Sequence, residues 1–197
     1  NSSGGAVNCD KDARLYCFEQ PDASERHFVT YCGRLGIAVH LVPWGRRKRV
    51  VAAVSELSRI VRQSWPCIIH THDFRADLVA WLVARRTGVP VIASNHAWHG
   101  MWKDIGWKEH AIEWIRERLL RDFRFVVDVS EATRRETIKR GVAPERSMTL
   151  YTGVNSPGGS VDREEVRRSM GIGADVTVVG NIARLYPEKG QAHLIEA

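Results

Sequence analysis

Two cations stand close together after an apolar stretch near the end of the chain, in the sequence VVGNIARLYPEKGQ (residues 178–191). Gly180 ends the apolar stretch and lets a ligand approach the backbone. The helix expected next offers unpaired N–H groups and the positive end of its dipole. Arg184 can bind phosphate oxygens through two parallel hydrogen bonds, and Lys189 adds a point charge. These residues could bind a phosphate or diphosphate; the alternative is an ordinary solvated loop with two surface cations.

Histidines form a second group of candidates. His70 and His72 are two positions apart on a predicted strand, so both side chains point to one face. Asp73 follows them, and His96 at the end of the next predicted strand could lie beside them. Two histidines and a carboxylate can form the metal site of a hydrolase, although Asp73 directly follows His72, unlike the H-x-H-x-D-H pattern of one hydrolase class. Two interpretations stay open: a metal-dependent hydrolase that uses His70, His72 and Asp73, or hydrogen-bonded histidines that line a cleft.

Short apolar segments alternate with amphipathic ones and must position these side chains. The predicted strands are residues 13–19, 37–42, 67–71, 89–96, 125–130 and 148–152, with helical spacing between them. This alternation predicts an α/β fold, a Rossmann-like doubly wound parallel sheet covered by helices on both faces. Ligands of such sheets bind beyond the carboxyl ends of the strands. The candidates at that edge are residues 181–189, described above, together with His70, His72, Asp73, Asn95, His96, His99, Ser130 and Glu131.

A change in composition marks the end of the first predicted domain, residues 1–152. The sequence GVNSPGGS (residues 153–160) has the composition of a linker, and Asp162 with Glu165 predicts the start of a short helix. Residues 153–174 are therefore expected to be a linker with a short helix. Residues 175–180 predict a fresh buried strand, so residues 175–197 are interpreted as the truncated start of a second Rossmann-like domain.

Charge and composition indicate which classes of binding partner to expect. The chain has 197 residues, a formal net charge of +6 and 44% hydrophobic residues, which is typical of folded proteins that favour anionic partners. The basic run GRRKR (residues 45–49) lacks interleaved aromatics, so no nucleic acid is expected. No stretch approaches the roughly 20 apolar residues of a membrane-spanning helix. The tryptophan-rich residues 96–107 are either packed core or a surface for an acceptor or a membrane, and we expect a cytoplasmic protein with possible peripheral membrane contact.

The ordered motifs resemble a known family. The sequence VVGNIARLYPEKG is similar to the donor-site signature of GT-B retaining glycosyltransferases of family four, in which a strand ends in V-G-R-L or a near variant and K-G follows. Upstream, IIHTHDFRADLVAWLVARRTGVPVIASNHAWHG resembles the central segment of that family, and FVVDVSEATRRETIKRGVAPERSMTLYTGVN resembles its stretch that ends in N-G-V-D. The resemblance covers residues 35–197.

This resemblance implies an enzyme that moves a sugar from a nucleotide-diphosphate sugar to a glycan or lipid-linked acceptor with retention. It implies that His96 is catalytic and that Gly180, Asn181, Arg184 and Lys189 bind the donor diphosphate, without a metal or other cofactor. Asn181 departs from the arginine that many members have there. Because the glycine-rich first loop and the paired glutamates of the family have no counterpart, we expect a fragment that is inactive alone. A module that binds anions without catalysis is the remaining alternative.

Overall fold

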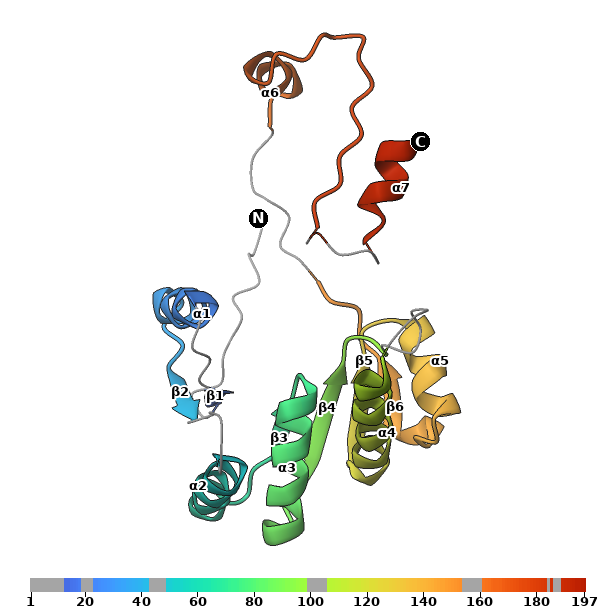
Figure 1. Cartoon of the computed structure of the whole chain (residues 1–197). Coiled ribbons are helices and arrows are strands. Elements are labelled where there is room, and N and C mark those ends of the chain that lie inside the picture. The colour runs from blue at the N-terminus through green and yellow to red at the C-terminus, as the bar shows by residue number, and fades with distance from the viewer. Residues whose placement is uncertain are drawn as a thin grey trace, which may run out of the picture.

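The computed structural model describes residues 13–18, 23–42, 49–98, 106–153, 161–183, 185 and 189–197. Strands and helices alternate along most of the chain (Figure 1). The strands are β1 (Leu15–Phe18), β2 (Val39–Val42), β3 (Ile69–Thr71), β4 (Val91–Asn95), β5 (Phe125–Asp128) and β6 (Ser147–Thr149). The helices are α1 (Ala23–Arg34), α2 (Arg49–Gln63), α3 (Phe74–Thr87), α4 (Trp107–Asp122), α5 (Glu131–Lys139), the 3-10 turn η2 (Pro144–Arg146), α6 (Arg163–Ser169) and α7 (Gln191–Glu196).

Four of these strands form a parallel sheet in the order β3-β4-β5-β6. The register pairs Ala93 of β4 with Val126 of β5, and Asn95 with Asp128. Since side chains alternate between the two faces of a strand, Ala93, Val126 and their paired neighbours point to one face, where both are fully buried. This confirms the predicted parallel α/β architecture.

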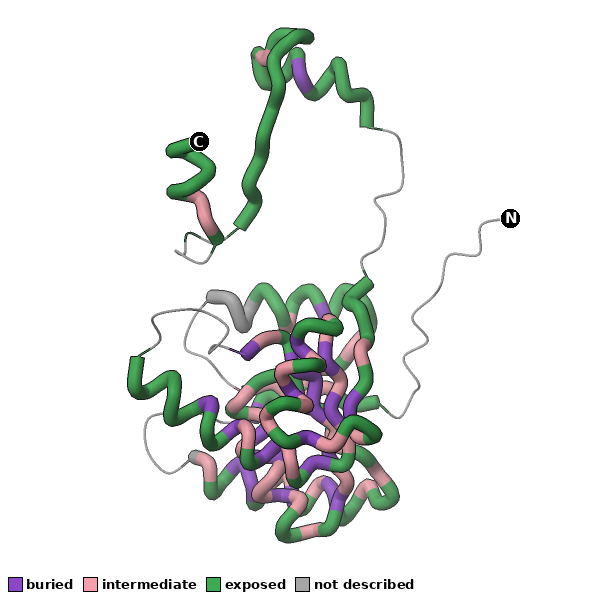
Figure 2. Tube along the Cα trace, turned by 90° about the vertical axis from the view of Figure 1, so that its right-hand side faces the viewer, coloured by how far each residue is buried: buried purple, intermediate pink, exposed green. Residues whose placement is uncertain are grey.

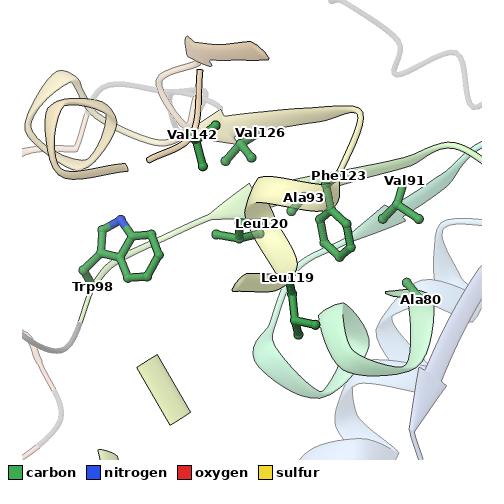
Figure 3. Packing of buried hydrophobic residues seen from close by; sticks show 9 residues of the cluster. All are labelled: Ala80, Val91, Ala93, Trp98, Leu119, Leu120, Phe123, Val126 and Val142. Atoms are coloured by element: carbon green, nitrogen blue, oxygen red, sulfur yellow. The ribbon is translucent and has the colours of Figure 1, made fainter. Parts of the chain in front are cut away.

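Helices α3 and α4 cover that buried face. Leu119 and Leu120 of α4 and Ala80 of α3 pack with Ala93 and Val126 in one hydrophobic cluster (Figure 3). Consecutive right-handed crossovers that step in one direction place their helices on the same face of a parallel sheet. The chain order of the strands therefore explains why this face is the well-packed one.

The opposite face of the sheet is less covered by the described residues. Its side chains include Ile92 and Val127, which are half-buried, and His70 and Met148, which are exposed. These four strands follow one another without a reversal, so the crossover helices between them gather on one face. Strands β1 and β2 pair parallel with each other in a separate two-stranded sheet.

A second hydrophobic cluster joins β1 and β2 to the helices. Val42 of β2 packs with Val54 and Val61 of α2 and with Val79 and Val83 of α3. The apolar positions of α2 recur at intervals of three and four residues, as a helix with one buried face requires. This cluster holds α2 beside α3 (Figure 1).

The chain after β6 differs from the sequence-based expectation. Asp162 caps α6 by accepting hydrogen bonds from the backbone N–H groups of Glu164 and Glu165, as its position before the helix predicts. Residues 175–180, predicted as a strand, pair with no strand among the described residues, and all of them are exposed (Figure 2). A strand needs a neighbour to satisfy its backbone, and the described chain supplies none there. Most of the predicted linker, residues 154–160, lies outside the described residues.

Candidate active site

Three histidines meet at the carboxyl ends of β3 and β4. His70 lies in β3, His72 follows that strand, and His96 follows β4. The rings of His70 and His72 are 4.5 Å apart, and those of His72 and His96 are 5.7 Å apart. His72 Nδ1 lies 3.4 Å from His96 Nε2, and His70 Nε2 lies 2.9 Å from the Ser94 hydroxyl. We call His70, His72 and His96 the histidine cluster; the structure confirms the predicted proximity.

Two members of the histidine cluster are held toward their neutral form. Partial burial lowers the pKa of His70, and the neighbouring His72 lowers it further. Burial also lowers the pKa of His72, as does His96, while the carboxylates of Asp73 and Asp77 act in the opposite direction. Neutral imidazoles can share hydrogen bonds in which one ring nitrogen donates and the other accepts. The pair His72–His96, with ring nitrogens 3.4 Å apart, can therefore share one hydrogen bond between the two rings.

Asp73 serves α3. Its Oδ1 atom accepts hydrogen bonds from the backbone N–H groups of Arg75 and Ala76, at 2.7 Å and 2.9 Å. This satisfies two of the donors that a helix start leaves unpaired.

Within the described ranges, no three His, Cys, Asp or Glu residues are grouped so that they could hold a metal ion.

A buried hydrogen-bonded network supports the strand end that carries His96. The Asn95 amide donates to Asp128 at 2.9 Å and to the Thr137 hydroxyl at 3.0 Å. Thr137 donates to Asp128 at 2.6 Å and accepts from the Trp98 indole N–H at 2.9 Å. All four side chains are at most 1% exposed. Because these residues flank His96 on both sides, the network limits the movement of its backbone.

Trp98 is further enclosed by two arginines. The Arg140 guanidinium lies 4.5 Å from its ring centroid, and that of Arg116 lies 5.4 Å away. Arg116 also donates to the Ala97 carbonyl at 3.1 Å and to the carboxylate of Asp77 at 3.0 Å. Burial raises the pKa of Asp77, and the pairing with Arg116 opposes that shift. Trp98, Arg116 and Asp77 were not predicted from the sequence as supports of His96, because the spacing of a buried acid on α3 and a buried base on α4 does not distinguish them from exposed ones.

The other predicted cleft residues, Ser130 and Glu131, follow the carboxyl end of β5. Ser130 caps α5, its hydroxyl accepting from the Thr133 backbone N–H at 3.1 Å. Glu131 accepts from the Thr149 hydroxyl at 2.7 Å and pairs with Arg134 at 3.5 Å. Parallel strands end at the same edge of a sheet, so these residues extend the edge that carries the histidine cluster.

Of the predicted diphosphate loop, the structure describes residues 180–183, 185 and 189–190. The Asn181 amide donates to the Lys189 carbonyl at 3.3 Å, and Gly180, Asn181 and Lys189 are exposed. Gly190 has a positive φ of 69° at the start of α7. Arg184 lies outside the described residues. The structure thus brings Asn181 and Lys189 together, while their proximity to the histidine cluster stays a prediction.

Comparison with known proteins decides the family. A family model described as "Glycosyltransferase Family 4" matches residues 10–156, about three quarters of the chain. The chain belongs to glycosyltransferase family 4. This membership agrees with the resemblance of the ordered motifs to glycosyltransferases. It does not favour the alternative of a metal-dependent hydrolase.

Curated relatives of this family 4 chain are distant. It is 23% identical over 141 residues to D-inositol 3-phosphate glycosyltransferase of Actinosynnema mirum, a match that covers 66% of this chain and 33% of that protein. It is 22% identical over 153 residues to alpha-maltose-1-phosphate synthase of Mycolicibacterium smegmatis, covering 73% and 40%. The chain thus spans between a third and two fifths of these relatives.

Solved structures show the same fold. The crystal structure of HepE from Anabaena in complex with UDP and glucose matches with a TM-score of 0.67 and 17% identity, over 93% of this chain and 56% of HepE. The complex of HepE with UDP-glucose matches with a TM-score of 0.69 and 18% identity, over the same shares. At this identity the match establishes the fold, which is the Rossmann-like fold of a GT-B glycosyltransferase.

Proposed function

We propose that the protein, in its full-length form, transfers a sugar from a nucleotide-diphosphate sugar to an acceptor and retains the configuration at the anomeric carbon. The main support for this proposal is the location of His96. This side chain stands at the carboxyl edge of the sheet, where open α/β sheets bind ligands. Its backbone lies between Asn95 and Trp98, which are both buried in one hydrogen-bonded network.

In this proposal His96 acts next to the reacting sugar. Its Nε2 atom is 3.4 Å from His72 Nδ1. When one of these two nitrogens carries a proton, the other can accept a hydrogen bond from it. A rigid support matters because catalytic groups lose effectiveness when they are displaced by as little as about 1 Å. The position of His96 at the edge of the sheet and the rigid support of its backbone are therefore both consistent with a catalytic role.

The donor diphosphate is proposed to bind at Gly180, Asn181, Arg184 and Lys189. Departure of a nucleotide diphosphate leaves negative charge on its phosphate oxygens, which two cations stabilise. The Asn181 amide donates a hydrogen bond to the backbone carbonyl of Lys189. The HepE complexes with UDP and UDP-glucose support a nucleotide-sugar donor by analogy. Under this mechanism the cations replace a metal ion, and no other cofactor takes part.

The acceptor is proposed to be a lipid-linked or envelope glycan that the protein meets at the inner face of a membrane. The net charge of +6 supports a location beside anionic lipids. No helix among the described residues is long and apolar enough to span a bilayer.

Sugar transfer by the full-length protein tests the proposal. We expect release of a nucleotide diphosphate from one of a panel of donors, with the acceptor as co-substrate, and a product whose anomeric configuration matches the donor by proton NMR. Lys189→Ala is expected to lower turnover about a hundredfold or more, whereas the matched change of an exposed lysine on α5, Lys139→Ala, leaves it unchanged. Wild-type turnover by Lys189→Ala would refute the donor-site assignment.

A second variant tests His96 separately. His96→Ala is expected to lower turnover about a hundredfold or more without changing the affinity for the nucleotide diphosphate, measured by calorimetry. Equal turnover of His96→Ala and the wild type would contradict the catalytic assignment and leave the donor assignment untouched.

A further inference from the structure

Helix α4 carries tryptophans on the side that faces away from the protein. Trp107 is 77% exposed and Trp114 is 67% exposed. They are seven residues apart, which is about two turns and about 10 Å along a helix. Ala111 and Ile115 fall on the same side, and Arg118 extends it by another turn. We call Trp107, Ala111, Trp114, Ile115 and Arg118 the tryptophan stripe.

The fold of the described domain does not require these tryptophans. The buried side of α4 consists of Glu113, Arg116, Leu119 and Leu120, which face the rest of the domain. Leu119 and Leu120 supply the apolar contacts to the sheet (Figure 3). A helix that buries one face in its own domain normally presents polar residues on the other. Two largely exposed indoles on the outer face of α4 therefore indicate a partner.

Charge decides what kind of partner fits. Lys108 lies over the Trp107 ring at 5.8 Å, and Arg118 continues the stripe. Of the acids on α4, Glu117 pairs with Arg121, and Asp122 accepts from the Trp81 indole N–H. Glu109 and Glu113 come two and six positions after Trp107, which places both on other sides of a helix with 3.6 residues per turn. The stripe thus combines indoles with flanking cations.

Indoles flanked by Lys and Arg are the combination that enters the headgroup region of an anionic bilayer. A tryptophan ring is apolar in its body and can donate a hydrogen bond at its N–H, so it is favoured at the boundary between lipid and water. Lysine and arginine stems follow the apolar surface while their charges stay among the phosphates. A protein partner would be expected to offer a shaped groove to the helix, whereas a bilayer accepts a convex row of this kind.

We propose that the tryptophan stripe of α4 docks the protein on the surface of an anionic membrane. The helix would lie in the plane of the surface, with Trp107 and Trp114 at headgroup depth. Helix α4 begins eleven residues after His96, so docking there would bring the carboxyl edge of β4 near the membrane. This inference rests on the lipid-linked acceptor of the proposed function and names the surface that meets the lipid.

Binding of the purified chain to vesicles tests this proposal without any sugar transfer. Vesicles of phosphatidylcholine mixed with phosphatidylglycerol are sedimented with the protein, and vesicles of phosphatidylcholine alone serve as the neutral comparison. We expect binding to the anionic vesicles that weakens with added salt. The double variant Trp107→Ser/Trp114→Ser is expected to lose affinity by about tenfold or more.

Two further variants complete the test. Lys108→Glu/Arg118→Glu is expected to remove the preference for anionic vesicles. Trp65→Ser changes a tryptophan that is 56% exposed but lies outside the stripe, and we expect it to bind as the wild type does. Circular dichroism checks that each variant is folded.

Several outcomes would overturn the docking surface. Absence of vesicle binding by the wild type refutes it, as does equal binding by the double tryptophan variant. A wild-type dimer that becomes monomeric in the double variant, without vesicle binding, would assign the stripe to a second copy instead. Because none of these readouts uses a donor sugar, loss of the docking proposal and loss of the transferase proposal are distinguishable.

Discussion

At the scale of single residues, the position of His96 depends on Thr137. The Thr137 hydroxyl contacts the Asn95 amide, the Asp128 carboxylate and the Trp98 indole at distances of 3.0 Å or less. It donates one hydrogen bond and accepts two, which is the full capacity of a hydroxyl group. Loss of this hydroxyl would leave donors on both sides of His96 without a partner.

Thr137→Val is expected to destabilise the protein. Valine keeps the shape of threonine but cannot bond to Asn95, Asp128 or Trp98, and unpaired buried groups cost about 1–3 kcal/mol. The free energy of unfolding in urea measures this loss. The matched change on the exposed side of α1, Thr30→Val, is expected to stay within about 0.5 kcal/mol of the wild type. Similar values for the two variants would show that the network carries no stability.

The histidine cluster makes stability depend on pH. The pKa values of His70 and His72 are lowered by folding, so the unfolded chain binds more protons below the ordinary value of 6.5. Stability is therefore fully present above that pH and falls as the pH drops through the lowered values. We expect a lower urea midpoint at about pH 5 than at about pH 7.5.

The control for this pH dependence is the variant His70→Gln/His72→Gln. Removal of both groups is expected to flatten the fall in stability between the two pH values. A double variant with the wild-type pH dependence would assign the effect to other groups.

The sequence could predict the chemical groups at this edge but not what supports them. His70, His72 and His96 were recognised because they stand at the ends of apolar stretches. The contact of Thr137 with Asn95 joins residues 42 positions apart and arises only once the register of β4 against β5 is set. Asp73 was predicted to line the cleft, yet its carboxylate caps α3, a competing use that its position before a helix also allows.

At the scale of elements, α3 and α4 are joined by a buried ion pair. Asp77 of α3 is fully buried and lies 3.0 Å from Arg116 of α4. Thr71 at the end of β3 donates to the same carboxylate at 2.6 Å. Arg116 reaches on to the Ala97 carbonyl, so one side chain links two helices to the loop after β4.

Arg116→Met is expected to destabilise the protein by about 3–5 kcal/mol, because it leaves the Asp77 carboxylate buried without its cation. The double variant Asp77→Asn/Arg116→Met removes both charges and is expected to recover a substantial part of that loss. Urea unfolding of both variants gives the comparison. A double variant that is less stable than Arg116→Met would show that packing, and not the unpaired charge, causes the loss.

The order and type of the elements followed from apolar spacing alone. Strands expected at residues 67–71, 89–96 and 125–130 appear as β3, β4 and β5 within those limits. The strand expected at residues 175–180 has an equally apolar sequence but pairs with nothing in the described chain. A β-strand forms only when a second segment pairs with it through backbone hydrogen bonds. The sequence of one segment therefore predicts a tendency to form a strand, and the neighbour determines whether the strand forms.

At the scale of the whole molecule, the four-stranded sheet has two unequal faces. Val126 is fully buried under α4, whereas Val127, the next residue of β5, points to the other face and is half-buried. The burial pattern along the chain shows the same contrast between the interior and the periphery of the domain (Figure 2). The two valines allow a direct comparison of the faces.

Val126→Ala is expected to lower the free energy of unfolding by about 2 kcal/mol, because the cavity forms in a closed core. Val127→Ala is expected to cost about half of that or less, since part of its side chain already meets solvent. Thermal or urea unfolding of both variants measures the difference. Equal losses would indicate that another part of the protein covers the second face in solution.

The order of the strands in the sheet also bears on how the chain folds. In the order β3-β4-β5-β6 each strand is the spatial neighbour of the strand that precedes it in the sequence. Each step closes a loop about as long as one helix, and such short closures are fast compared with pairings between distant segments. The sheet can therefore grow one strand and one helix at a time as the chain leaves the ribosome, starting from β3 and ending with the strand that completes the edge of the site.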